Sequence, residues 1–148
     1  MPGTALGMHL NPTRTQYDAF KALPRDEPCQ MLNLVALEDA ADYPAGHPAA
    51  AERLSGTQAY ARYGQLSRPV FERVGGRILW SGTPRAMLIG PADEAWDIAF
   101  IAAYPSAHAF LAMVADPDYQ QAVIHRTAAV RSSRLIRMLP RAAGQGFG

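Results

Sequence analysis

The stretch Gln30–Leu37, which reads QMLNLVAL, decides the fold predicted for this chain. Alternate side chains of a β-strand point to opposite faces. One face would therefore hold Leu32, Leu34 and Ala36, and the other would hold Met31, Asn33, Val35 and Leu37. Because both faces are largely apolar, both must be covered, and one layer of helices can cover only one of them. The stretch predicts a sheet whose second face packs against a second copy of the chain.

Two long helical segments follow this strand in the sequence. The first is expected to begin at Ser55, because Ser55 and Gln58 match a capping box, and to end at Gly75-Gly76. Its inward stripe would consist of Tyr60, Tyr63, Ser67, Val70, Phe71 and Val74. The second is expected from Ser106 to Val114 and to restart at Asp116-Pro117, with an inward stripe of Tyr119, Ala122, Val123, Arg126, Thr127 and Val130.

Three further strands are expected at residues 76–90, 96–104 and 134–139. We interpret residues 76–90 as one long strand with a bend at Ser81-Gly82-Thr83-Pro84, and a tight hairpin is the alternative. Both faces of residues 96–104 are again mainly apolar. The order β-α-β-β-α-β is a split βαβ arrangement, which predicts an α+β, ferredoxin-like fold with an antiparallel sheet.

The length of 148 residues predicts a single domain with short additions at each end. Residues 1–29 are expected to form an N-terminal extension with a short helix opened by Pro12-Thr13 and stopped by Pro24. Residues 30–140 would form the domain, and residues 141–148 a flexible C-terminal tail. Within the domain, residues 38–54 form a long polar connection of a kind that is often functional.

Composition excludes several classes of protein. With a net charge of only +1, the chain is not expected to bind nucleic acid. Cys29 is the single cysteine, so a disulfide framework within the chain is impossible. Residues 1–10 do not resemble a signal peptide, and no apolar run approaches the roughly 18 residues of a membrane span. We therefore expect a cytoplasmic protein with no membrane partner, and the abundance of Ala with a single lysine, Lys21, is typical of bacterial origin.

Motifs for metal and cofactor chemistry are missing from the sequence. No two histidines lie three or four residues apart, and no phosphate loop, dinucleotide fingerprint or serine-hydrolase elbow is present. Cys29 has no paired histidine motif and is not expected to be a nucleophile. We expect neither a metal nor a cofactor.

The pair His125-Arg126 is the candidate catalytic site. Arg126 falls on the inward stripe of its helix, where a cation needs a partner. It could bind a carboxylate or an enolate, with His125 as a nearby acid or base. Adjacent helical side chains point about 100° apart, so the two cannot both face one spot. In the alternative, Arg126 pairs with Asp97, Asp116 or Asp118 while His125 lies at an interface.

Candidate substrate-binding residues are Asn33, Tyr63, Trp80, Asp97 and Tyr104. Asn33 interrupts an apolar face and could present its amide to a ligand, or it could serve only local hydrogen bonding. The aromatic residues could line a pocket, although aromatic residues at core spacing more often serve packing.

Several motifs of the chain resemble a known bacterial family. They include residues 31–34, 60–64, 75–82, 88–91, 104–106, 116–120, 125–126 and 133–136, and residues 19–28 are similar to its longer members. The chain resembles a family of domains of unknown function in the dimeric α/β-barrel superfamily, whose relatives include muconolactone isomerases and cofactor-free antibiotic-synthesis monooxygenases. The resemblance implies the ferredoxin-like fold and a homodimer whose two sheets face each other. It implies no particular reaction.

Two functions remain open from the sequence. The first is a cofactor-free enzyme, of isomerase, lyase or monooxygenase type, whose pocket between sheet and helices takes a small apolar or aromatic acid. The second is a non-catalytic dimeric protein that binds a small ligand or serves as an accessory subunit. An open cavity lined by convergent polar groups would favour the first.

Overall fold

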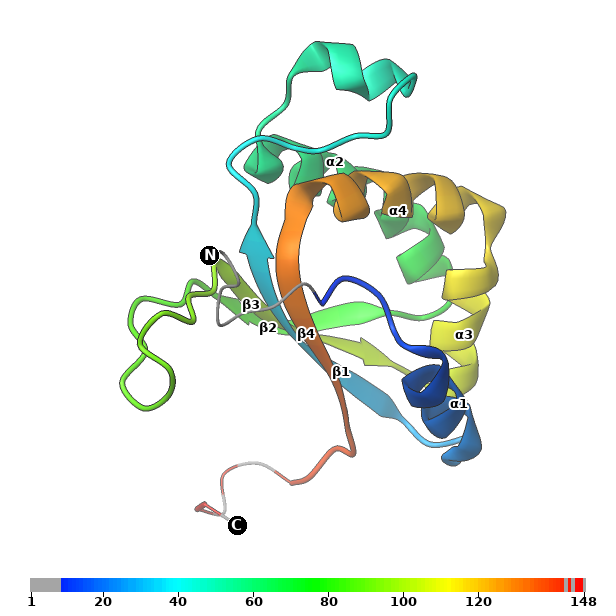
Figure 1. The fold of residues 1–148 in the computed structure, drawn as a ribbon. Helices are drawn as coiled ribbons and strands as arrows, with labels where there is room; N and C mark the ends of the chain where they lie inside the picture. The colour runs from blue at the N-terminus through cyan, green and yellow to red at the C-terminus, as the bar shows by residue number, and fades with distance from the viewer. Residues whose placement is uncertain (1–8, 143, 145, 148) are drawn as a thin grey trace.

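The computed structural model describes residues 9–142, 144 and 146–147 (Figure 1). Residues 1–8 of the predicted extension, and residues 143, 145 and 148 of the predicted tail, lie outside the described residues.

Four antiparallel strands form one sheet at the centre of the molecule. They are β1 (Cys29–Leu37), β2 (Arg77–Gly82), β3 (Ile98–Tyr104) and β4 (Val130–Met138). Their order in space is β2-β3-β1-β4, with β1 paired to β3 on one side and to β4 on the other. The two strands that follow the helices in sequence thus become the edges. This is the ferredoxin-like βαββαβ fold of the α+β class, as the sequence predicts.

The helices lie on one side of the sheet (Figure 1). They are α1 (Arg14–Ala22), α2 (Gly56–Arg73), α3 (Ala107–Ala115) and α4 (Pro117–Ala129), with a short 3₁₀ helix, η1 (Pro48–Glu52), in the long connection. The capping box of Ser55 and Gln58 is present, and Asp116 caps α4 directly before Pro117. Local sequence signals therefore determine where these helices begin.

Two predicted strands differ from the observed ones. Strand β2 ends at Gly82, and residues 83–97 form a loop rather than the second half of a bent strand. Pro84 cannot donate to a neighbouring strand, which accounts for the early end. Strand β4 begins at Val130, four residues before the predicted start, because β1 pairs with it as far as Leu37. The pairing partner, rather than local sequence, sets this boundary.

The face of the sheet turned toward the helices holds the core. Cys29, Met31, Asn33 and Val35 of β1 lie opposite Tyr104, Ala102, Phe100 and Ile98 of β3. Two clusters of buried apolar residues form there, and Phe100 packs against both. Asn33, directly opposite Phe100, is therefore the polar residue at the point where the two clusters meet.

The other face of the sheet is open and largely apolar, although Gln30 of β1 and Arg134 of β4 also lie on it. It carries Leu32 and Leu34 of β1, Ile101 of β3 and Ile136 of β4, which follow the alternation and the strand register. Trp80, opposite Ile101, is 54% exposed, and Ile136 and Met138 are 46% and 42% exposed. Among the described residues no helix covers this face (Figure 1).

The N-terminal extension passes β4 before it forms α1 (Figure 1). Its attachment consists largely of polar contacts to backbone carbonyls. Arg137 donates to the carbonyls of Phe20 (3.3 Å) and Pro24 (2.6 Å), and α1 contains no buried residue. Phe20 adds an aromatic contact with Phe110, at 5.2 Å between ring centroids.

Candidate functional site

Arg126 is a half-buried cation that has no carboxylate partner among the described residues. Its Nη1 donates to the backbone carbonyl of Leu10 (2.9 Å), and its Nη2 donates to Oγ of Ser133 (3.1 Å). Both partners are neutral. A guanidinium in a poorly solvated position is stabilised best by a carboxylate, so Arg126 is the natural anchor for an anionic ligand.

The predicted acidic partners of Arg126 are engaged elsewhere. The carboxylate of Asp97 accepts from the backbone N–H of Leu37 (2.7 Å), and Asp116 pairs with Arg73 of α2 (2.6 Å). Asp118 occupies the first turn of α4. The alternative in which one of these residues neutralises Arg126 is therefore wrong.

Three tyrosines lie between α2 and α4, and two of them, Tyr60 and Tyr63, are near enough to feel the charge of Arg126. The hydroxyls of Tyr63 and Tyr119 are 2.9 Å apart, and the rings of Tyr60 and Tyr63 are 5.4 Å apart. Burial raises the pKa of Tyr60 to about 12, although the charge of Arg126 opposes the rise. Burial and the neighbouring tyrosines raise the pKa of Tyr63 well above its usual value. Tyr60 and Tyr63 are therefore neutral hydrogen-bond donors at physiological pH.

Asn33 adds an amide at the sheet side of this region. Its Nδ2 donates to the carbonyl of Met31 in its own strand (3.1 Å), which is the local bonding that the sequence allows. No described residue donates to its Oδ1. The arginine–tyrosine site, which we define as Tyr60, Tyr63, Tyr119 and Arg126, combines one cation with phenol hydroxyls, and Asn33 lies on the sheet face that is turned toward the helices.

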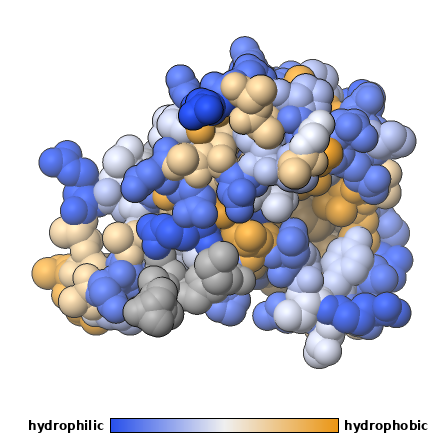
Figure 2. Space-filling view, turned by 45° about the horizontal axis from the view of Figure 1, so that its top comes forward, coloured by the Kyte–Doolittle hydropathy of each residue, from blue (hydrophilic) through white to orange (hydrophobic). Residues whose placement is uncertain are grey.

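Figure 2 shows the surface of the molecule with the top of Figure 1 turned forward, where apolar surface lies in a recess bordered by hydrophilic residues.

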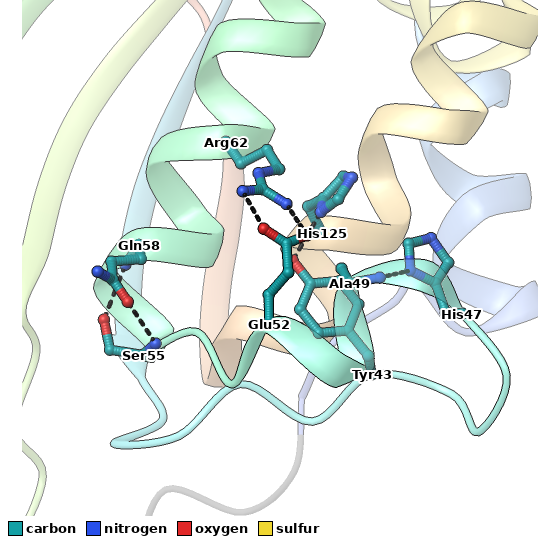
Figure 3. A network of polar contacts seen from close by, with 8 residues as sticks. All are labelled: Tyr43, His47, Ala49, Glu52, Ser55, Gln58, Arg62 and His125. Carbon is teal, nitrogen blue, oxygen red and sulfur yellow. Dashed lines mark hydrogen bonds and ion pairs between the residues drawn. The ribbon is translucent and has the colours of Figure 1, made fainter.

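His125 lies in a different group of residues, the histidine cluster, which consists of Tyr43, His47, Glu52, Arg62 and His125 (Figure 3). Its Nδ1 is 2.6 Å from the hydroxyl of Tyr43. The ring of His47 stacks on Tyr43 and meets His125 edge-on, with centroids 5.2 and 5.6 Å apart. Glu52 accepts two hydrogen bonds from Arg62, at 2.7 and 3.0 Å.

The charge state of this cluster follows from burial. His125 is 8% exposed, and burial lowers the pKa of His125, with further lowering by Arg62 and His47 against an opposing effect of Glu52. Burial also raises the pKa of Tyr43. Both groups are neutral near pH 7, and a hydrogen bond joins the hydroxyl of Tyr43 to the imidazole nitrogen of His125.

The structure does not bring His125 and Arg126 together. Successive side chains of a helix diverge by about 100°, so His125 turns toward the connection and Arg126 toward the sheet and the extension. Sequence reasoning missed Tyr43, His47 and Glu52, which all come from residues 38–54. The only available signal was the length and polarity of that connection.

Two of the predicted substrate-binding residues, Trp80 and Asp97, lie away from the arginine–tyrosine site, whereas Tyr104 shares a core cluster with Tyr119 and Tyr63. Trp80 is on the open face of the sheet, and Asp97 bonds the end of β1. Tyr104 is buried in the core, where its hydroxyl donates to Sδ of Met113 (3.8 Å) and its ring contacts Phe71 and Phe110. Tyr104 also borders a hollow of about 240 Å³ at the end of the sheet, with Gln30, Arg77 and Ala103.

Two kinds of site are not found in the described part of the chain. No group of three or more His, Cys, Asp or Glu side chains is placed there to hold a metal ion. No helix in that part is both long and apolar enough to cross a membrane.

Residues 49–138 match the model of DUF1330, a domain of unknown function. The chain belongs to the DUF1330 family. Strand β1 and the N-terminal extension lie before the matched segment, whereas α2, α4 and three strands lie within it. The comparison with curated proteins found no match.

Several solved structures are similar to this chain. A protein of unknown function from Rhodopseudomonas palustris is 49% identical, with 91% of this chain and 98% of that chain covered and a TM-score of 0.83. The methylated form of that protein gives 48% identity, 93% and 98% coverage and a TM-score of 0.86. SnoaB, a cofactor-independent oxygenase from Streptomyces nogalater, is 17% identical, with 79% and 96% coverage and a TM-score of 0.46.

Proposed function

We propose that this DUF1330 protein binds a small carboxylic acid with an apolar or aromatic body at the arginine–tyrosine site and acts on it without a cofactor. The observation that supports the proposal is the half-buried guanidinium of Arg126, whose partners among the described residues are all neutral. An unpaired cation in such a place costs free energy that an anionic ligand would recover. The surrounding tyrosine rings suit an apolar or aromatic ligand body.

The proposed chemistry is the stabilisation of negative charge. Isomerisation, elimination and oxygenation of such acids can all pass through a carbanion or an enolate. Arg126 would hold the carboxylate, and the neutral hydroxyls of Tyr60 and Tyr63 would donate to the oxygen on which charge develops. These donors would act in a poorly solvated place, where each hydrogen bond to an anion is strongest.

One observation favours the second candidate, non-catalytic ligand binding. Neutral phenols, a guanidinium and a carboxamide are all poor proton acceptors at neutral pH. His125, the predicted base, is bonded to Tyr43 in the histidine cluster. Turnover separates the two candidates: a bound acid whose mass and structure stay unchanged after incubation supports binding alone.

The binding test uses benzoate, phenylacetate and salicylate in titration calorimetry. We expect Arg126→Gln to weaken binding by about 10-fold to 100-fold, because a charge-assisted hydrogen bond contributes about 1.5–3 kcal/mol. Arg68→Gln makes the same change in charge on the exposed face of α2 and should leave the affinity unchanged. Tyr60→Phe keeps the ring and should weaken binding less than Arg126→Gln. If none of the three acids binds the wild-type protein or its Leu10→Ala variant, in which the segment that covers Arg126 is loosened, the proposal is wrong.

We also propose that the protein is a homodimer in which the open sheet faces of two copies meet. The support is the apolar surface of that face, above all Trp80, Ile136 and Met138. Exposed apolar surface of this extent is typical of an interface between proteins.

A further inference from the structure

We infer that residues 9–13, which we call the strap, are a displaceable cover of the arginine–tyrosine site, and that the backbone carbonyl of Leu10 occupies the place on Arg126 that a ligand carboxylate takes. The inference rests on the proposed function, because it assigns a means of regulation to the same site.

The strap, Arg126 and β4 are tied together through Ser133. The carbonyl of His9 accepts from both the backbone N–H and the hydroxyl of Ser133, each at 2.8 Å. The same hydroxyl accepts from Nη2 of Arg126 (3.1 Å), while Nη1 donates to the carbonyl of Leu10 (2.9 Å). The strap therefore occupies the outer end of the guanidinium and also bonds the free edge of β4.

The exchange of Leu10 for a ligand is chemically favourable. A backbone carbonyl is a neutral acceptor, whereas a carboxylate carries a full charge and can accept two parallel hydrogen bonds from one guanidinium. Charge-assisted bonds are roughly twice as strong as neutral ones. The strap thus supplies a hydrogen-bond acceptor to Arg126 in the free protein. That hydrogen bond is weaker than the ones a ligand carboxylate would make.

The strap can move without disrupting the core. Its residue Leu10 is only half-buried at the margin of a core cluster. Helix α1, which follows the strap, is held separately, because Phe20 packs against the other core cluster and Arg137 donates to the carbonyls of Phe20 and Pro24. Segments with few buried apolar contacts open at the lowest free-energy cost. The strap also precedes the segment that matches the family model.

Two measurements test the inference, with the same panel of benzoate, phenylacetate and salicylate. The first is hydrogen exchange of the Ser133 amide, whose only described acceptor outside the sheet is His9. We expect ligand to accelerate this exchange by about 10-fold or more, because displacement of the strap frees the amide. The second is the affinity of Leu10→Ala, which loosens the strap without touching Arg126. We expect it to bind acids about threefold to tenfold more tightly, because less of the protein is held in the covered state.

Leu23→Ala is the matched control. Leu23 lies in the same extension, is 50% exposed and should not alter the affinity when truncated. One outcome would contradict the strap but leave the proposed function intact. In that outcome an acid binds the wild type without changing the exchange rate of the Ser133 amide, and it binds Leu10→Ala and Leu23→Ala with equal affinity. If acids bind Leu10→Ala alone, both the site and its cover are supported. If no protein binds any of the acids, both proposals are wrong.

Discussion

At the scale of single residues, His125 shows how burial sets a charge state. Its Nδ1 is hydrogen-bonded to the hydroxyl of Tyr43 at 2.6 Å, next to the ring of His47 and near the guanidinium of Arg62. Protonation would add a cation to a place that already contains Arg62, with Glu52 committed to its own ion pair. His125 is therefore neutral in the folded protein.

This lowered pKa predicts a pH dependence of stability. Between the lowered pKa in the folded state and the usual histidine value of about 6.5, the unfolded chain binds more protons than the folded one. The free energy of unfolding should thus be highest above pH 6.5 and fall as the pH drops below it. Denaturant titrations between pH 7.5 and about 5 measure this slope. His125→Gln keeps a polar partner for Tyr43 and should flatten the slope between these pH values. If the slope of this variant equals that of the wild type, the pH dependence comes from other groups.

At the scale of elements, caps and register explain how much of the fold could be predicted. Thr13 and Ser55 carry complete capping boxes, so local sequence placed the starts of α1 and α2 correctly. The start of β4 depends on its pairing with Leu37, which local sequence does not contain. The same distinction applies to the site. Helical periodicity identified Tyr63 and Arg126, whereas Tyr43 meets His125 from 82 residues away.

The junction between the connection and α2 depends on a glycine. A Cβ at Gly56 would lie 1.9 Å from the carbonyl oxygen of Glu38, which is backbone and cannot rotate away. We expect Gly56→Ala to lower the free energy of unfolding by at least about 1–3 kcal/mol. Gly64→Ala is the matched control in the same helix, where a Cβ meets nothing within 4 Å. It should raise stability by about 0.5–1 kcal/mol, since alanine is the better helix former. Equal effects of the two substitutions in denaturant titration would contradict the steric argument.

At the scale of the whole molecule, the sheet has one face packed by helices and one apolar face without such a layer. We expect the wild-type protein to sediment at twice the chain mass of 16.0 kDa at micromolar concentration. Ile136→Glu places a charge in the open face and should shift the protein to the single-chain mass, because an unpaired charge at an apolar interface is costly.

Leu66→Glu is the comparison for the dimer. Leu66 is similarly exposed, at 48% against 46% for Ile136, but lies on α2 on the helical side of the molecule. The dimer should persist in this variant. A wild-type protein that sediments at 16.0 kDa would leave the open face in contact with water and refute the homodimer.

Lys21, the single lysine of the chain, lies on α1 with its amine 4.8 Å from the ring of Tyr17 and 3.8 Å from Asp18. Amine-directed fluorophores, spin labels and crosslinkers can therefore modify only one side chain of the protein. That side chain belongs to the helix that follows the strap. The sequence thus offers a ready position for a spectroscopic reporter beside the proposed strap, without any engineered cysteine.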